Sequence, residues 1–390
     1  MMTRLGDVCD ILNGFAFKSE QYVDDGIRII RIANVQKGYI EDSTPVFYPF
    51  DSKDAKKYSL EEGDMLMSLT GNVGRVAKLS KEFLPAALNQ RVACLRIKDG
   101  VALDKAFLFN LLNSDYFEQQ CIAASKGVAQ KNMSTEWLKE YEFPMFSLEQ
   151  QKAIASVLDK VTELIALRKE QLAKLDQLVK SRFVELFGDL MLNLYEWPVV
   201  KISDVSLLLK SGLSRKLSDD DIGLPVIRSG NIQNGQFIYD DVKYWYKDDP
   251  QGSKTEDYIL EDGDILVNFI NSASQIGKTA IFRDVGRDCI YTTNIFRMKL
   301  SENCNEYYYN WFAMSDYYYR QLQNIIQPAV NQASFTTVNF LKLNIPLPPM
   351  ELQEQFAAFV EQTDKSKLAI QQSLDKLELL KKALMQDYFG

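Results

Sequence analysis

The sequence has 390 residues, of which 46% are hydrophobic and 25% charged, with a formal net charge of −8. This length exceeds one ordinary hydrophobic core, so two or more domains are expected. It contains no histidine, and none of its five cysteines forms a CxxC pair, which disfavours Ser-His and Cys-His catalysis and most zinc sites. The first residues lack the apolar core of a signal peptide, and no apolar run approaches the roughly 20 residues of a membrane span, so we expect a cytoplasmic protein.

The first globular region spans residues 1–146 and mixes strand and helix signals. Short β-rich runs at 27–35, 64–69 and 91–97 are bounded by Asp-Gly and Asn-Gly turn signals. The stretch 104–120 has helical spacing. An α+β domain therefore fits better than a repeated βαβ unit.

A long helix is predicted over the next segment, residues 147–188. Ser147 and Gln150 form a capping-box pattern, no Gly or Pro interrupts residues 147–187, and Gly188 suits the left-handed position that ends a helix. A narrow apolar stripe, typical of a coiled-coil seam, runs along it. Its members are Ile154, Val157, Val161, Leu164, Leu172, Leu175, Val179 and Leu186.

The second half of the chain repeats the first, with a globular region at 189–346 and a helix at 347–390. Gly63 and Asp64 recur as Gly263 and Asp264, and a second apolar stripe appears at Phe356, Val360, Ile370, Leu374, Leu377 and Leu384. A second matched set keeps one constant offset: Arg31, Asn34, Gln36 and Gly38 recur as Arg228, Asn231, Gln233 and Gly235. Matches in the same order identify a tandem repeat.

Pairing the two long helices antiparallel would cover both apolar stripes. The expected architecture is therefore α+β: two tandem α/β domains separated by two long helices that form an antiparallel coiled coil, with pseudo-two-fold symmetry. The acidic net charge weakens a nucleic-acid-binding interpretation without excluding it, because phosphate is bound by a local basic face rather than by the whole chain.

Four stretches carry a family resemblance: "LGDVCDILNGFAFKS" (5–19), "LNQRVACLRI" (88–97), "FPMFSLEQQKAIASVLDKVTELI" (143–165) and "IPLPPMELQEQFAAFV" (345–360). Together with the order of the segments, they make the chain resemble the specificity subunits of type I restriction-modification systems over essentially its whole length. The resemblance implies that each globular region is a target recognition domain for one half of a split double-stranded DNA target. Because the two domains differ outside the repeated framework, it implies an asymmetric target.

The resemblance also implies partners. The helices would set the spacing between half-sites and dock two methyltransferase subunits, with restriction motor-nuclease subunits joining afterwards. This chain would bind no cofactor. S-adenosylmethionine, together with ATP and Mg where a nuclease subunit is present, would be used by the partner subunits.

DNA contacts are predicted for the loops that follow the "GDML" and "GDIL" strands and for their neighbours. Arg and Lys suit guanine, whereas Asn and Gln suit adenine. The candidates in the first domain are Ser68, Thr70, Asn72, Arg75, Asn89, Gln90, Arg91, Lys126, Gln130 and Lys131. Those in the second domain are Asn268, Asn271, Ser272, Gln275, Lys278, Thr293, Asn294, Asn331 and Gln332.

Two other classes of function were weighed. A free-standing methyltransferase or nuclease lacks support, because no Asn/Asp-Pro-Pro-aromatic motif is present; we predict no catalytic or metal-ligating residue. The alternative is a structural adaptor that assembles partner subunits without reading DNA, although the predicted loops are rich in the residues that read bases. The "IGKTA" stretch (276–280) is not a phosphate loop, since that motif needs Gly where Ser272 stands. The aromatic runs within 307–320 are interpreted as domain core.

Overall fold

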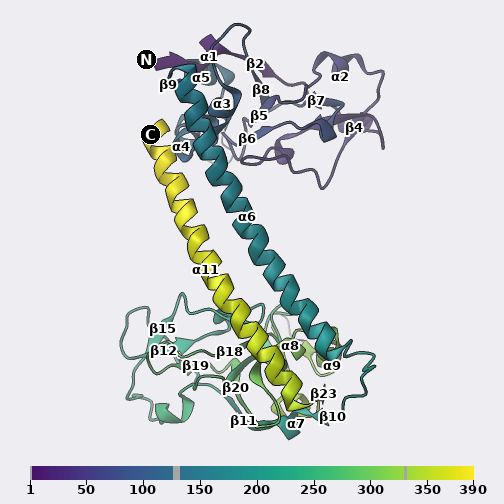
Figure 1. The fold of residues 1–390 in the computed structure, drawn as a ribbon, viewed down its shortest axis with the longest axis vertical. Helices are drawn as coiled ribbons and strands as arrows, with labels where there is room; N and C mark the ends of the chain where they lie inside the picture. Colours follow the sequence, from purple (N-terminus) through teal and green to yellow (C-terminus); the bar gives the residue numbers. More distant parts are fainter. Residues whose placement is uncertain (1, 126–131, 329–331) are drawn as a thin grey trace. The chain divides into compact units, whose positions relative to one another are not determined.

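The computed structural model describes residues 2–125, 132–328 and 332–390 (Figure 1). The chain forms two compact units. The first consists of Met1–Glu170 with Gln371–Gly390, and the second of Gln171–Ile370. Each unit therefore combines one globular region with segments of both long helices.

The globular region of the first unit contains two main sheets. A four-stranded antiparallel sheet has the order β2-β8-β5-β6, and a three-stranded sheet has the order β4-β3-β7, in which β3 and β7 are parallel. The strands are β1 (Met2–Arg4), β2 (Cys9–Asn13), β3 (Ile27–Ile30), β4 (Phe47–Tyr48), β5 (Met65–Ser68), β6 (Val76–Lys78), β7 (Ala86–Leu88), β8 (Val92–Ile97) and β9 (Glu142–Pro144). The helices are α1 (Leu5–Val8), α2 (Lys53–Lys57), α3 (Lys105–Leu112), α4 (Asp115–Ala124) and α5 (Thr135–Glu140).

The globular region of the second unit repeats this plan. Its four-stranded sheet has the order β11-β20-β16-β18, and its three-stranded sheet the order β15-β12-β19. The strands are β10 (Val199–Lys201), β11 (Ser206–Ser211), β12 (Leu224–Ile227), β15 (Lys243–Trp245), β16 (Ile265–Asn268), β18 (Thr279–Ile281), β19 (Ile290–Tyr291), β20 (Ile295–Leu300) and β23 (Asn344–Pro346). The helices are α7 (Ile202–Val205), α8 (Glu306–Phe312), α9 (Asp316–Gln323) and α10 (Thr337–Phe340). The predicted tandem repeat of mixed α and β domains is confirmed.

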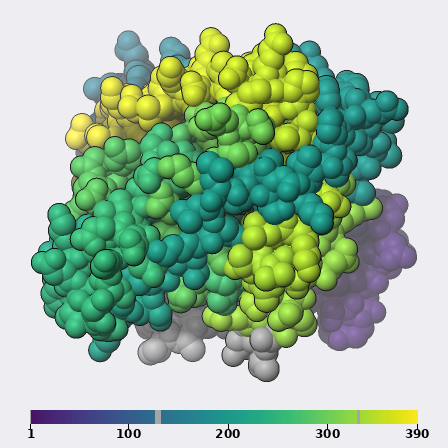
Figure 2. Space-filling view, turned by 90° about the horizontal axis from the view of Figure 1, so that it is seen from below, coloured from purple at the N-terminus to yellow at the C-terminus, as the bar shows by residue number. Residues whose placement is uncertain are grey.

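The second unit also contains short strands, which the described residues of the first unit match only with the isolated bridges Val35–Ile40 and Thr70–Asn132. They are β13 (Ile232–Gln233), β14 (Gln236–Phe237), β17 (Ile270–Asn271), β21 (Gln327–Pro328) and β22 (Ala333–Ser334). The segment between the first long helix and β10 runs over the outside of this unit, and β10 pairs with β23. In Figure 2, which views the molecule from below, the teal atoms of this part of the chain lie at the surface beside yellow-green atoms of later residues.

The repeated Gly-Asp pairs build the turn before each central strand. Gly63 and Gly263 have φ angles of +85° and +86°, a conformation that suits glycine. The carboxylate oxygen Oδ2 of Asp64 accepts the backbone N–H of Glu61 at 2.8 Å. Asp264 accepts that of Glu261 at 2.6 Å. The pair therefore recurs in both halves for backbone geometry rather than for binding.

The two long helices are α6 (Leu148–Phe187) and α11 (Met350–Phe389). The predicted capping box is present, because Gln150 N–H donates to Ser147 Oγ at 3.2 Å and Ser147 N–H donates to Gln150 Oε1 at 3.1 Å. Gly188 follows α6 with φ +74°, as predicted for the residue that ends it. No helix within the described ranges has both the length and the apolarity that crossing a bilayer requires.

The helix segments pair antiparallel within each unit. In the first unit, Lys169 lies 2.8 Å from Glu378, while Ile154 and Leu158, earlier on α6, pack with Phe389 near the end of α11. In the second unit, Lys367 lies 2.6 Å from Asp176. There, Phe183 and Phe187, later on α6, contact Phe356 near the start of α11.

The predicted seam of α6 was wrong at two positions. Val157 and Leu164 are 41% and 42% exposed, whereas their neighbours Leu158 and Ile165 are buried and half-buried. The seam therefore advances from Ile154 in alternating steps of four and three residues, the spacing of a heptad. Two adjacent apolar residues at 157–158 and again at 164–165 made the register ambiguous in the sequence.

The aromatic runs of the second domain lie in its core, as predicted. Tyr308, Tyr309, Phe312 and Tyr318 are all fully buried, and the phenol of Tyr318 donates to the carbonyl of Gly277 at 3.1 Å. Burial raises the pKa of each of these three tyrosines well above the usual value. Base stacking by these rings is therefore excluded in this conformation.

Candidate nucleic-acid interface

Two loops meet at one edge of the four-stranded sheet in the first unit. Ser68 at the end of β5 pairs with Val92 at the start of β8. Met67 pairs with Val76 at the start of β6, so the loop 69–75 leaves and re-enters the sheet at the same edge. The turn 89–91 precedes β8 there. Most of the predicted contact residues are thereby brought together.

Ser68 supports this loop from inside the domain. Its side chain is fully buried, and its hydroxyl hydrogen-bonds the carbonyl of Asn72 and accepts the backbone N–H of Arg75 at 3.2 Å. Gly74, with φ +82°, packs against α4 so closely that a Cβ would lie 2.7 Å from the Cβ of Cys121. The loop is thus fixed by its own polar and steric contacts, and Ser68 cannot reach DNA in this conformation.

The outer residues of these loops are accessible. Asn72, Gln90 and Arg91 are exposed, and Asn89 and Arg75 are half-buried. Arg75 Nη1 donates to the side-chain oxygen of Gln36, and no carboxylate within the described residues forms an ion pair with either arginine. The two arginines bring positive charge to this sheet edge, and the Asn and Gln side chains bring amide groups. Contacts to base edges or phosphates require such groups.

Thr70 connects the same loop to the segment that precedes α5. Its hydroxyl donates to Asn132 Oδ1 at 2.8 Å, and the carbonyl of Leu69 accepts the backbone N–H of Met133 at 2.9 Å. Thr70 is 3% exposed, which gives it a supporting position like that of Ser68. The predicted contacts Lys126, Gln130 and Lys131 lie outside the described residues.

The equivalent edge of the second unit has the same backbone frame. Asn268 N–H bonds the carbonyl of Lys278 at 2.9 Å, and Gly277 N–H bonds that of Asn268 at 2.7 Å. Ser68 N–H bonds Arg75 and Gly74 N–H bonds Ser68 in the same way, at 3.0 Å each. Asn268, like Ser68, is fully buried, so it also serves the frame.

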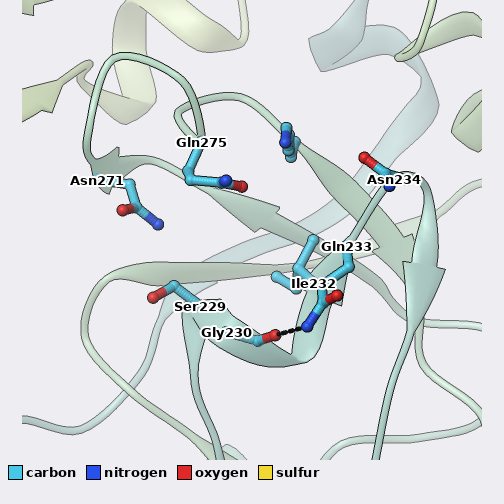
Figure 3. Close-up of a pocket in the computed structure, with 8 residues that line it drawn as sticks. Ser229, Gly230, Ile232, Gln233, Asn234, Asn271 and Gln275 are labelled. Atoms are coloured by element: carbon cyan, nitrogen blue, oxygen red, sulfur yellow. Dashed lines mark hydrogen bonds between the residues drawn. The ribbon is translucent and has the colours of Figure 1, made fainter. Parts of the chain in front are cut away.

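An open pocket of about 360 Å³ lies at this edge of the second unit (Figure 3). Asn271 and Gln275 line it from the loop after β16, and Gln233 and Asn234 line it from the β13–β14 turn. Lys278 completes the lining, and no carboxylate among the described residues forms an ion pair with it. The pocket therefore presents mainly polar groups, namely amides and one cation, beside the apolar side chain of Ile232.

The remaining candidates of the second unit lie around this pocket's loop. Thr293 and Asn294 are half-buried in the turn before β20, where the Asn294 carbonyl accepts the N–H of Phe269 at 3.1 Å. Ser272 is exposed, and its N–H donates to Asn271 Oδ1 at 2.8 Å. Gln332 is exposed next to β22. Asn331 lies outside the described residues.

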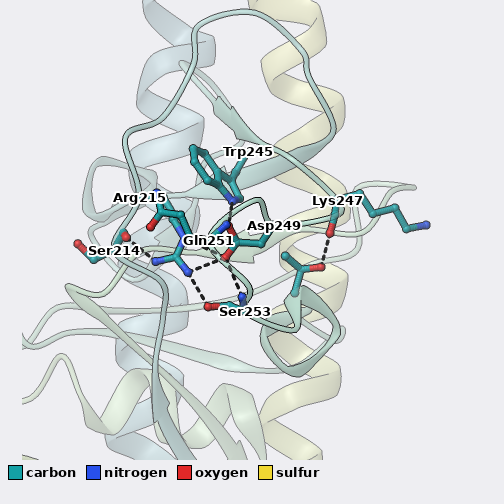
Figure 4. Close-up of polar contacts among 8 residues, drawn as sticks. Ser214, Arg215, Trp245, Lys247, Asp249, Gln251 and Ser253 are labelled. Atoms are coloured by element: carbon teal, nitrogen blue, oxygen red, sulfur yellow. Dashed lines mark hydrogen bonds and ion pairs between the residues drawn. The ribbon is translucent and has the colours of Figure 1, made fainter.

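One basic side chain that a sequence-based search for phosphate contacts would select is already used inside the protein. Arg215 pairs with Asp249 at 2.5 Å and also donates to Ser253 Oγ, while Trp245 Nε1 donates to the same carboxylate at 3.2 Å (Figure 4). These bonds, first of all that from Arg215, hold the pKa of Asp249 well below its usual range. The cluster stiffens an outer loop of the second unit instead of offering a free cation.

A family model described as "Type I restriction modification DNA specificity domain" matches residues 1–177 and 195–379. The chain belongs to this family of type I specificity subunits. Each half of the tandem repeat therefore carries one specificity domain, and each sheet edge described above belongs to one of them.

Several relatives are named as type I specificity subunits. The chain is 30% identical over 195 residues to the putative type I restriction enzyme MjaX specificity subunit of Methanocaldococcus jannaschii, an alignment that spans 50% of this chain and 45% of that protein. It is 23% identical over 374 residues to the type I restriction enzyme EcoKI specificity subunit of Escherichia coli K12, covering 91% of this chain and 80% of that one. The match to MjaX thus spans about half of that relative's length.

Solved structures share the fold. The type I S subunit from M. genitalium aligns with a TM-score of 0.61 at 15% identity, over 100% of this chain and 96% of that one. A chain from a structure on complex assembly and conformational transition of the type I R-M system aligns with a TM-score of 0.58 at 17% identity, over 100% and 97%. At this identity the agreement concerns the tandem architecture.

Sequence reasoning missed the glutamines of the two specificity domains that lie against the predicted loops. Gln36 and Gln233 were matched to each other as part of the repeat but were not chosen as site residues. A signal was available, since the same polar residue recurs at the same place in both halves among residues that otherwise differ. The geometry gives these residues a position beside Arg75 and Lys278 respectively.

Proposed function

We propose that this specificity subunit reads a bipartite, asymmetric double-stranded DNA target, with one half-site contacted by each sheet edge. The observation that carries the proposal is one backbone frame bearing different polar side chains. Asn72 and Arg75 in the first unit stand where Gln275 and Lys278 stand in the second. Base-edge recognition depends on side-chain chemistry at fixed positions, so two different sets read two different half-sites.

The proposal assigns chemistry to partner subunits rather than to this chain. The five cysteines are buried, and burial raises the pKa of Cys289 to about 11 and that of Cys9 to about 12, which opposes a thiolate nucleophile. The described residues contain no group of three or more His, Cys, Asp or Glu side chains able to hold a metal ion. S-adenosylmethionine, and ATP with Mg where a nuclease subunit is present, would be used by those partners. With chromosomal DNA as its target, the complex is proposed to work in the cytoplasm.

The long helices are proposed to set the half-site spacing and to dock two methyltransferase subunits, with motor-nuclease subunits joining later. Their outer faces favour a protein partner. Leu167 and Leu379 in the first unit and Leu178 and Leu368 in the second are 45%, 69%, 49% and 61% exposed. A protein partner docked on these faces would remove the four leucine side chains from water, which supports the proposal.

The test uses the chain assembled with its methyltransferase subunits. Methylation of a random-sequence DNA library, read by methylation-sensitive sequencing, should yield one split and asymmetric motif. Replacing residues 1–146 with the corresponding region of another specificity subunit should change the letters of one half only. Assembly of a methylating complex that shows no sequence preference would instead support the adaptor function and overturn the proposal.

A further inference from the structure

We propose that Gln36 is a positioning residue that orients Arg75 for reading one guanine in the first half-site, and that Gln233 and Lys278 form the corresponding pair in the second. The inference rests on the proposed function and specifies which side chains carry base discrimination. It concerns Gln36 and Gln233, which recur at matching positions of the two halves.

Gln36 is fixed at both ends of its amide. Its Nε2 donates to the carbonyl of Ala33 at 2.9 Å, and its Oε1 accepts from Arg75 Nη1. Each of these bonds removes a rotamer from a side chain that would otherwise be mobile. The guanidinium of Arg75 is consequently held in one orientation before any DNA is present.

The turn that carries Gln36 is itself locked in place. Asn34 is buried, and its Oδ1 accepts the N–H of Arg31 at 2.9 Å while its Nδ2 donates to the carbonyl of Glu41 at 2.7 Å. Gly38 N–H donates to the carbonyl of Val76, the residue after Arg75, at 2.8 Å. The glutamine and the arginine are therefore held together by the backbone as well as by their side chains.

The second unit repeats these hydrogen bonds within the turn, with a lysine in place of the arginine. Asn231 Oδ1 accepts the N–H of Arg228 at 2.9 Å, and Gln233 Nε2 donates to the carbonyl of Gly230 at 2.9 Å (Figure 3). Gln233 and Lys278 line the same pocket, although no hydrogen bond joins them among the described residues. Lysine acts as a point charge and has less need of an orienting acceptor than arginine has.

The fixed orientation favours base reading over phosphate binding. A phosphate is attracted by charge and accepts donors from many directions, whereas guanine O6 and N7 require two donors in one plane. Arg75 has no carboxylate partner among the described residues, so its remaining N–H groups are available. An amide that orients an arginine without neutralising it provides such a donor pair.

The test measures binding of the complex with methyltransferase subunits to the target and to variants with one base pair changed. Arg75→Ala should lose about 5- to 150-fold of the discrimination at a single base pair of the first half-site. Gln36→Leu should lose about 2- to 10-fold at the same base pair, the effect of one hydrogen bond. Gln36→Glu keeps an acceptor for Arg75 but loses the N–H donated to Ala33 and adds a carboxylate that neutralises the cation, so it should restore the preference only in part.

The second half-site serves as the internal control. Gln36→Leu and Arg75→Ala should leave its letters unchanged, while Lys278→Ala should relax one base pair there. Lys278→Arg, with the oxygen of Gln233 in the same pocket, should sharpen that preference. In the double variant Gln36→Leu with Arg75→Ala, the loss should equal that of Arg75→Ala alone.

Three results would overturn the inference. One is an equal loss of affinity for every sequence together with a reduced salt slope, which would identify Arg75 as a phosphate contact. Another is a loss at two different base pairs for the two variants. A third is unchanged discrimination in Gln36→Leu at a melting temperature equal to that of the parent. A parent complex without any sequence preference would instead contradict the proposed function itself.

Discussion

Gln151 and Gln353 occupy equivalent, fully buried positions near the starts of α6 and α11. Gln151 Oε1 accepts the N–H of Asp104 at 2.7 Å, and Gln353 Oε1 accepts that of Asn305 at 2.9 Å. Each Nε2 donates to the chain just before its own helix, at the carbonyls of Phe146 and Pro348. The glutamine repeated in the two junctions therefore bonds each long helix to the residue that caps the first main helix of its globular region.

Replacing either glutamine by leucine should destabilise its unit. The apolar side chain would leave one backbone N–H and two backbone carbonyls at the junction without their present partners, at a cost of about 1–3 kcal/mol. Urea unfolding followed by circular dichroism measures this. Gln362→Leu on the exposed face of α11 is the matched control and should stay within roughly 0.5 kcal/mol of the parent. Equal effects at buried and exposed positions would contradict the role given to the junction.

Replacing glycines by alanine should separate two contributions to the loss of stability: steric overlap of the new Cβ and the strain of a left-handed backbone. Gly277 has φ +80°, and a Cβ there would lie 2.0 Å from Cδ2 of the buried Leu322. Gly71 has φ +73°, and a Cβ at this residue would meet no atom within 4 Å. Gly71→Ala should therefore cost only about 1–2 kcal/mol for the left-handed backbone. Gly277→Ala should cost more than this, by a further 1–3 kcal/mol or so, because leucine must move. Comparable melting temperatures for the two variants would refute this.

Acid should selectively weaken the Arg215–Asp249 cluster. Because the folded pKa of Asp249 is depressed, its stabilising contribution is fully present above the ordinary aspartate pKa of about 3.9 and is lost as the pH falls through the folded value. The difference in urea midpoint between the parent and Asp249→Asn should therefore be largest near neutral pH and shrink below about pH 4. Asp248→Asn, one residue away and exposed, is the control. A difference independent of pH would mean that the charge contributes nothing.

Adding one heptad to both long helices should change the target spacing but not its letters. Seven residues add about 10 Å of helix, equivalent to roughly three base pairs. Methylation-sensitive sequencing of a complex with the extended subunit measures both quantities at once. An extension of seven residues keeps the heptad register of the seam, whereas one of five residues breaks it and should lower stability. Altered half-site letters after the heptad extension would argue against separate roles for helices and sheet edges.

The repeat made the architecture predictable, because matched turns and capping signals depend on local chemistry. The boundaries of α6, its capping box and Gly188 followed from residue types whose preferences are strong. The seam was harder, since Val157 next to Leu158 offers two registers and only the partner helix selects one. Tertiary packing decided what the local pattern left open.

The sequence predicted which loops form the candidate site, but it did not show which side chains support the loop and which face outward. Ser68 and Asn268 were chosen because they are polar and follow a strand, yet both are buried and serve the loop backbone. A polar side chain that satisfies buried backbone groups and one that faces a ligand look identical in a sequence. Gln36 was not chosen from the sequence, and its contact with Arg75, which is distant in the chain, becomes visible in the structure.

The first hydrophobic core includes Met385 and Phe389, contributed by the last turns of α11, whereas every residue of the second core lies between positions 179 and 360. During synthesis on the ribosome, the later-encoded core can thus be completed first. The earlier-encoded core has to wait for the final helix to emerge, and until then Phe107 and Leu158 lack their covering side chains. The order in which the two cores can be completed is thus the reverse of the order in which they are encoded.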